Sequence, residues 1–365
     1  MLTPSWIMRG FYGQAPAPQP GDSRGPSPAS GITIPPVRVI VITSGSHGDV
    51  HPYIAIARAL QSRGHQVRFL VHTHFHDAVR AAGLEPVAIT PSIDIHAVLR
   101  DPDLMHRRRG GRLVMEMIFN SIPEAHDTLA HQIDDFQADA VVAHQICIGS
   151  RWLCERRAVP FATATLSPLL WFSRRTPIAC MQRHPGRLHY LIARALLSSG
   201  LPLVRFMSDR RVNSIRASLG YPPQRRCLES DFLGGDINLG MWSPLIRGPQ
   251  PDDPPHGRIC GFPWYDGSAA TPALDRGIES FLAQGEPPIV FCLGTAASHT
   301  AGDFHHLAAH AAAQIGRRAI LLVGQGVAPP DELPRGVIAA PYAPFSLLLH
   351  RCAASVHHGG IGSTA

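Results

Sequence analysis

Runs of apolar residues alternate with amphipathic segments along most of the chain, starting at residue 37. The run 37–43, VRVIVIT, has apolar residues at successive positions, which is typical of a strand buried on both faces. A polar loop follows, and then Ile54, Ala57 and Leu60 recur at the spacing of a helix that ends at Gly64. The same alternation predicts further strands over 65–72, 84–90, 139–144, 160–165 and 236–241, and further helices over 75–82, 111–133, 147–157 and 186–219.

A stretch rich in Pro, Gly and Asp, residues 243–275, interrupts this pattern and indicates a linker. Strands are predicted after it over 287–294, 319–324, 336–340 and 353–358, and helices over 275–284, 303–316 and 344–350. Strands that alternate with helices form parallel sheets with right-handed crossovers. The sequence therefore predicts an α/β protein with two Rossmann-like domains, 37–245 and 276–365, joined by a linker over 246–275, with the second domain incomplete.

The amino-terminal residues 1–36 differ from the rest in composition. They contain eight Pro, five Gly and a single acidic residue, Asp22, and they lack the compact apolar run of a signal peptide. Such a segment cannot bury enough apolar surface to fold, so we expect a disordered extension there.

Composition and charge narrow the classes of partner. The chain has 365 residues, 45% of them hydrophobic, and a net charge of +6, but all of its 33 basic residues are arginine. Nucleic-acid binders usually combine Lys and Arg in one basic stripe, so nucleic acid is not indicated as a partner. The seven cysteines form no C-x-x-C pair, which disfavours a zinc site or a disulfide framework and fits a reducing cytoplasm. The sequence contains no uninterrupted run of about 18 apolar residues, so no membrane-spanning helix is predicted.

The loop SGSHGDVHP, residues 44–52, follows the first predicted strand. Ligands of open parallel sheets bind beyond the carboxyl ends of the strands, so this loop is a candidate site. Pro52 is expected in the first helical turn, where proline is tolerated, which places Asp49 just before the helix. There Asp49 can cap the helix or act as a general base that takes a proton from an acceptor hydroxyl. The loop lacks the G-x-G-x-x-G fingerprint of dinucleotide-binding proteins.

The second candidate loop is HHGGIGSTA, residues 357–365, which follows the last predicted strand. Its glycines leave backbone amides open, Ser363 and Thr364 add hydroxyl groups where a helix begins, and His358 adds a further donor. Free amides at the start of a helix bind anions, so the loop predicts a site for a nucleoside diphosphate. Gly294 and Thr295, after the strand 287–294, form a weaker candidate for contact with the same ligand.

Histidines at alternating positions, His72, His74 and His76, could suggest a metal site. Ligation by all three would require an extended backbone where a helix is predicted, so we expect no metal site there.

Two motifs carry a resemblance to a known family. TSGSHGDVHP, residues 43–52, and VHHGGIGST, residues 356–364, resemble the two loops of the bacterial and fungal branch of family 1 glycosyltransferases, which have the GT-B fold. The resemblance extends from residue 37 to the last residue. Within this branch, the stretches 45–69, 261–285 and 342–362 look most like the rhamnosyltransferase of rhamnolipid biosynthesis.

The resemblance implies an inverting hexosyltransferase with two domains that face each other across a cleft, the first binding the acceptor and the second the nucleotide sugar. The donor would be a dTDP- or UDP-hexose such as dTDP-rhamnose, and the acceptor a hydroxyl of a hydroxyacyl lipid, sterol or polyketide. This corresponds to glycolipid or secondary-metabolite biosynthesis by a cytoplasmic enzyme, with peripheral contact with the membrane. No metal or other cofactor is implied.

The resemblance also implies roles for individual residues. Asp49 matches the general base of the family, and Ser46, His47 and Gly48 form the acceptor-side loop around it. The implied donor-binding residues are His358, Gly359, Gly360, Gly362, Ser363, Thr364, Gly294 and Thr295.

The family continues after the second motif with a helix, further strands, an acidic residue followed by Gln that reads the sugar, and a final helix. This sequence ends at Ala365. We therefore expect a truncated second domain that exposes a sheet edge and apolar faces and binds donor weakly. The alternative to an active enzyme is a non-catalytic fragment of one. A dinucleotide oxidoreductase is disfavoured by the missing fingerprint, and a nucleotide-sugar epimerase by the Asp49 loop.

Overall fold

The computed structural model describes residues 35–91, 98, 101, 103–104, 106, 109–171, 205–267 and 273–364, without the side chains of 295 and 296. Most of the expected extension over 1–36 and the first part of the expected helix over 186–219 lie outside these ranges. Residues 205–218 of the latter are helical.

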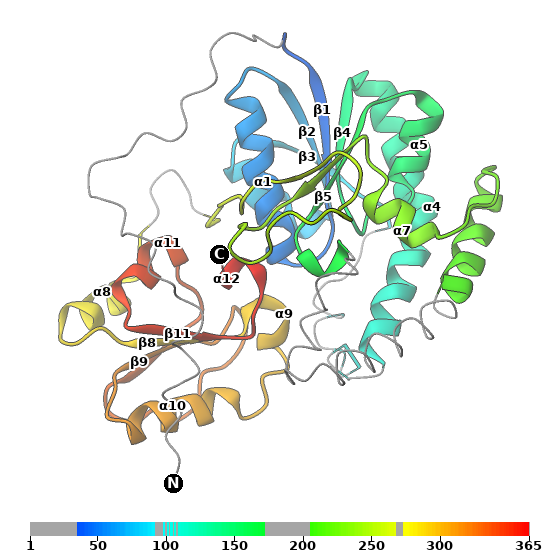
Figure 1. Cartoon of the computed structure of the whole chain (residues 1–365). Helices are drawn as coiled ribbons and strands as arrows, with labels where there is room; N and C mark the ends of the chain where they lie inside the picture. The colour runs from blue at the N-terminus through cyan, green and yellow to red at the C-terminus, as the bar shows by residue number, and fades with distance from the viewer. Residues whose placement is uncertain are drawn as a thin grey trace. The chain divides into compact units, whose positions relative to one another are not determined.

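The first half of the chain forms a sheet of seven parallel strands in the order β3-β2-β1-β4-β5-β6-β7 (Figure 1). The chain runs from β1 to β3 in one direction and from β4 to β7 in the other, so the strand order reverses between β1 and β4. In open α/β sheets this reversal marks the ligand-binding edge. The strands are β1 (Arg38–Ile42), β2 (Gln66–Val71), β3 (Glu85–Ala88), β4 (Ala140–His144), β5 (Phe161–Thr165), β6 (Ile237–Gly240) and β7 (Gly257–Ile259).

Helices cover both faces of this sheet, as the apolar run in β1 predicts. Val39 and Val41 point into a core beneath α1, while Ile40 and Ile42 point into a second core beneath α4 and α5. Successive apolar positions are needed because successive side chains point to opposite faces. The helical segments are α1 (His47–Gln61), η1 (Thr73–Phe75), α2 (His76–Ala81), α4 (Gly110–Phe136), α5 (Ser150–Arg157), η2 (Pro168–Leu170) and α7 (Cys227–Leu233).

The second half forms a smaller parallel sheet in the order β10-β9-β8-β11 (Figure 1). Its core repeats the same arrangement, since Ile320 and Leu322 point toward α8 and α11 while Ala319 and Leu321 point toward α10. The strands are β8 (Ile289–Cys292), β9 (Ala319–Leu322), β10 (Val337–Ala340) and β11 (Ala354–His357). The helical segments are α8 (Arg276–Ala283), α9 (Gly294–Ser298), α10 (Phe304–Gln314), α11 (Phe345–Leu348), η4 (Leu349–Arg351) and α12 (Ile361–Thr364).

The predicted α/β class with two parallel sheets is confirmed, with two local differences. The helix α1 begins at His47, inside the segment expected to be a loop, so Pro52 lies within the helix and Asp49 lies in its first turn. Residues 257–259, inside the segment expected to be a linker, form β7 and pair with β6. The other domain boundaries remain predictions.

The edge strands of the second sheet are β10 and β11, and β11 pairs with β8. Val356 in this strand is 43% exposed. In the part of the chain that the structure describes, no helix combines the length and apolar character that crossing a bilayer requires.

Candidate active site

Asp49 and Ser46 together begin the helix that follows β1. Ser46 is the N-cap residue of α1 and Asp49 is the third residue of the helix. The Ser46 amide donates to Asp49 Oδ2 at 2.8 Å, and the Ser46 hydroxyl donates to the same oxygen at 2.9 Å. The N3 side chain thus reaches back to the N-cap residue, as in a capping box. The expectation that Asp49 precedes the helix was wrong, because the serine three residues earlier takes the N-cap position.

Gly45 leaves the space that this carboxylate occupies. Its φ is +120°, and a Cβ at this position would be 2.4 Å from Asp49 Oδ2. A side chain at position 45 would therefore be strained by the backbone and would displace the carboxylate. The absence of a side chain at Gly45 is therefore required for this placement of Asp49.

The second carboxylate oxygen of Asp49, Oδ1, lies near His144 of the neighbouring strand. The side chain is 36% exposed, and Oδ1 lies 3.7 Å from Nε2 of His144, whose side chain is 1% exposed. Burial lowers the pKa of His144 to about 4, against a raising effect of the Asp49 charge, so this imidazole is neutral at pH 7. Asp49 therefore holds Oδ2 in the cap, while Oδ1 lies beside a buried, neutral histidine and the side chain remains partly exposed.

His144 was missed in the sequence analysis. It is the last residue of β4, which pairs with β1, so it reaches the edge of the sheet that carries the Asp49 loop. The available signal was a polar residue at the end of an otherwise apolar strand. His72, directly after β2, is similar: it is buried, and its Nε2 lies 2.9 Å from the Ser44 hydroxyl.

The acceptor-side loop residues are at the surface of this edge. His47 is the first residue of α1 and packs edge-on against His51 and Phe75, and Gly48 is exposed. Burial lowers the pKa of His47 and lowers that of His51 to about 4. These imidazoles are therefore neutral, and they form an aromatic surface rather than a charged one.

The described residues contain no group of three His, Cys, Asp or Glu side chains that could hold a metal ion. His74 lies in η1 and His76 opens α2, so the alternating histidines do not lie on an extended segment.

In the donor-side loop, His358 follows β11 and contacts the loop that follows the neighbouring strand β8. Its imidazole lies between two glycines, because a Cβ at Gly294 would be 2.6 Å from Cε1 and a Cβ at Gly360 would be 2.4 Å from Nε2. Gly294 has a φ of +71° and begins α9 directly after β8, whereas His358 follows β11. The two candidate segments that the sequence separates by more than 60 positions are therefore in contact. Gly359 lies in the same loop, and Gly362 lies in α12, which follows it.

The hydroxyl groups expected to donate to a diphosphate already have partners within the loop. Thr364 Oγ1 donates to the Gly360 carbonyl at 2.9 Å, and the Ser363 side chain hydrogen bonds with that of Cys292. In this structure the two hydroxyls stabilise the turn, and a role for Ser363 and Thr364 in donor binding stays a prediction. The side chain of Thr295 lies outside the described part of the structure.

The two candidate loops approach each other. Ile361 of α12 packs against the core cluster that includes Val50 and Tyr53 of α1, and α1 also contacts α9. Phe262 lies close to Gly362, with 3.8 Å between the Phe262 ring and a Cβ built at Gly362. These contacts bring the start of α1, with Asp49, into the neighbourhood of the donor loop.

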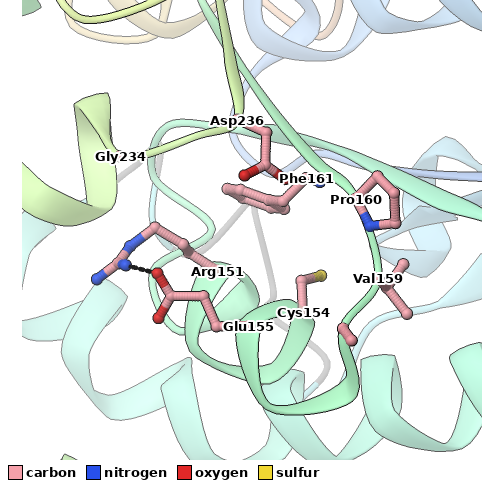
Figure 2. A pocket seen from close by; sticks show the side chains of 9 residues that line it. Arg151, Cys154, Glu155, Val159, Pro160, Phe161, Gly234 and Asp236 are labelled. Atoms are coloured by element: carbon pink, nitrogen blue, oxygen red, sulfur yellow. Dashed lines mark hydrogen bonds and ion pairs between the residues drawn. The ribbon is translucent and has the colours of Figure 1, made fainter.

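A pocket of about 270 Å³ lies elsewhere in the first domain. Figure 2 shows Arg151 and Glu155 paired at its wall, with Asp236 and Phe161 above them. Residues 159–161 and 236 immediately precede or begin β5 and β6, so this pocket is at the amino-terminal edge of the sheet. It is on the opposite side from the carboxyl ends of the strands, where open sheets bind ligands. Its Arg151 pairs with Glu155, and Asp236 accepts a hydrogen bond from the Phe161 amide.

Comparisons by sequence identify related proteins. Residues 39–173 match the glycosyltransferase family 28 N-terminal domain. The chain is 29% identical over 344 residues to O-mycaminosyltylonolide 6-deoxyallosyltransferase of Streptomyces fradiae, covering 90% of this chain and 77% of the relative. It is 28% identical over 350 residues to a sterol 3-beta-glucosyltransferase of Arabidopsis thaliana, covering 91% of this chain. It spans 53% of that plant relative, about half of its length.

Solved structures share the fold. The glycotransferase of kitacinnamycin superposes with a TM-score of 0.66 at 17% identity, covering 90% of this chain and 77% of the other. Spinosyn rhamnosyltransferase SpnG, complexed with thymidine diphosphate, has a TM-score of 0.57 at 17% identity and covers 90% and 76%. The architecture is thus GT-B, and together with the sequence relatives it supports a nucleotide-sugar-dependent glycosyltransferase.

Proposed function

We propose that this chain transfers a hexose, with inversion, from a nucleoside-diphosphate sugar to a hydroxyl of a lipophilic acceptor, with Asp49 as the general base. The observation that carries the proposal is that the two oxygens of the Asp49 carboxylate have different neighbours. Ser46 occupies Oδ2 with two hydrogen bonds, whereas Oδ1 accepts none of these bonds and the side chain as a whole remains 36% exposed at the carboxyl edge of the first sheet. A fixed carboxylate with one free oxygen is suited to remove a proton from a bound hydroxyl.

In this reaction the acceptor oxygen attacks the anomeric carbon while the bond from that carbon to the diphosphate breaks. The acceptor proton passes to Asp49 Oδ1, and the nucleoside diphosphate leaves with the bonding electron pair. In this proposal His358 donates to a diphosphate oxygen; its imidazole is exposed, and Gly294 and Gly360 make room for the ring. A neutral donor fixed in place stabilises the charge that develops on the leaving group.

We further propose that the donor is a dTDP- or UDP-hexose and that dTDP-rhamnose is the first to test. The stretches that resemble the rhamnolipid rhamnosyltransferase and the thymidine diphosphate bound in a structural relative support this choice. The macrolide and sterol named for the two sequence relatives support a large apolar acceptor with one reactive hydroxyl. A hydroxyacyl lipid has the same character, and its use would place the enzyme at the cytoplasmic face of the membrane.

No metal is required in this scheme, since hydrogen-bond donors of the protein offset the diphosphate charge. A screen tests the whole proposal. Purified protein is incubated with dTDP-rhamnose, dTDP-glucose or UDP-glucose and with a 3-hydroxyacyl lipid, a sterol or a macrolide aglycone, with and without EDTA. We expect equal amounts of glycosylated acceptor and nucleoside diphosphate, unaffected by EDTA. Absence of both nucleotide binding and product with every pair would contradict the proposal.

The role of His358 has its own test in the same assay. His358→Ala should weaken the binding of thymidine diphosphate by about tenfold, the loss typical of one hydrogen bond to a charged group. His350→Ala, which removes an exposed imidazole from η4, is the matched control. Equal affinities of the two variants, measured by calorimetry, would remove His358 from the donor site.

A further inference from the structure

The imidazole of His144, next to Asp49, is held by a strand and by an aromatic ring. It ends β4, where Ala143 pairs with Ile42 of β1, and its side chain is 1% exposed. The Tyr53 ring packs edge-on against the imidazole with the ring centres 5.3 Å apart. Because a strand and a buried aromatic ring hold the imidazole, it has little freedom to turn away from Asp49.

The hydrogen bonds of His144 define which ring nitrogen carries the proton. The Ile146 amide donates to Nδ1 at 3.4 Å, so Nδ1 is the acceptor and the neutral ring carries its proton on Nε2. Nε2 is buried and has no hydrogen-bond partner among the described residues. A buried donor without a partner is costly, and Asp49 Oδ1 lies 3.7 Å away.

The other titratable groups around the imidazole are uncharged. Burial raises the pKa of Tyr53 and raises that of the Cys147 thiol to about 12. The Tyr53 hydroxyl donates to the Ala164 carbonyl and the Cys147 thiol donates to the Ile42 carbonyl, so neither competes for Nε2. The charge that acts on His144 is that of Asp49.

From this arrangement we infer that His144 is a positioning residue for Asp49. The Nε2–H of His144 donates to Oδ1 of Asp49 when substrate is bound. The inference rests on the proposed function. The present separation is about 0.8 Å longer than a typical charge-assisted bond, and catalytic hydrogen bonds often tighten only in the complex. Oδ1 has two lone pairs, so one can accept from His144 while the other receives the acceptor proton. The proton of His144 stays on Nε2 throughout.

Two variants separate this role from packing. His144→Gln retains an N–H donor near the position of Nε2, whereas His144→Phe fills the same volume without a donor. We expect His144→Phe to lower kcat by 10- to 100-fold with unchanged KM for the donor, the loss that accompanies a misplaced catalytic group. His144→Gln should recover most of this loss. A folded His144→Phe enzyme with the kcat of the wild type, or a glutamine variant as slow as the phenylalanine variant, overturns the inference.

A second measurement decides the pairing without turnover. Imidazole ¹H–¹⁵N spectra at neutral pH should show His144 protonated at Nε2, and Asp49→Asn should shift that resonance. A proton on Nδ1, or a resonance that does not respond to Asp49→Asn, overturns the inference even if sugar transfer is established. Conversely, a wild-type protein that transfers no sugar but shows the shifted Nε2–H contradicts the proposed function and leaves the pairing intact.

Discussion

The imidazole of His358 packs against the bare backbone of Gly294, leaving no room for a methyl group between the loops that follow β8 and β11. Gly294 has positive φ, so a side chain there would be strained by the backbone as well as by the contact. The donor loop is therefore held by a contact that depends on one glycine in each of two loops.

Gly294→Ala should disrupt this contact, and Gly316→Ala is its matched control. Gly316 has a φ of +63° with nothing within 4 Å of a built Cβ, so the control carries the backbone strain alone. We expect the control to lose about 1–2 kcal/mol of unfolding free energy. Gly294→Ala should lose more and should also weaken thymidine diphosphate binding, as measured by urea unfolding and calorimetry. Identical behaviour of both variants would show that the Gly294 contact has no special role.

Gly45→Ala should impair turnover through Asp49. The new methyl group would lie 2.4 Å from Asp49 Oδ2 and would displace the carboxylate from the Ser46 amide. Gly64→Ala, with a φ of +88° and open space around the built Cβ, is the control for backbone strain. We expect the Gly45 variant to lose at least tenfold in kcat while the control keeps its rate. Retention of full kcat by the Gly45 variant would argue against a catalytic role for the capped carboxylate.

Stability should decrease as the pH falls below 6.5, because buried neutral histidines must take up a proton. The pKa of His144 is lowered from 6.5 to about 4, so the unfolded chain binds the proton more readily in this window. Linkage then gives a loss of about 2 kcal/mol from His144 between pH 7 and pH 5. His144→Gln should remove that part of the pH dependence in urea unfolding, whereas His310→Gln, at an exposed position, should not. An equal pH dependence in both variants would contradict the burial effect.

Much of the fold follows from local patterns. In β1, Val39 and Val41 face one core and Ile40 and Ile42 the other, so the unbroken apolar run predicts a strand buried on both faces. The strand β7 could not be predicted in the same way. It has three residues in a stretch rich in proline and glycine, and it forms because β6 offers an open edge.

The residues of the candidate site that lie in local sequence motifs were predicted. The residue that reaches the site only through the order of the strands was missed. Asp49 and His358 lie in recognisable loops, but the start of α1 was misplaced because Pro52 lies in the interior of the helix rather than in its first turn. His144 contacts the Asp49 loop because β4 is the neighbour of β1. That adjacency is a property of the sheet and is not visible in the segment around His144.

The most direct test of the account is the release of nucleoside diphosphate by Asp49→Asn. This variant keeps the shape of the side chain and removes its charge, and Asp77→Asn, at an exposed position in α2, is the control. With the best donor and acceptor pair, we expect Asp49→Asn to lose at least 100-fold in kcat, the contribution of a general base, while binding thymidine diphosphate as the wild type does. An Asp49→Asn protein that turns over at the rate of the Asp77→Asn control would contradict the central claim.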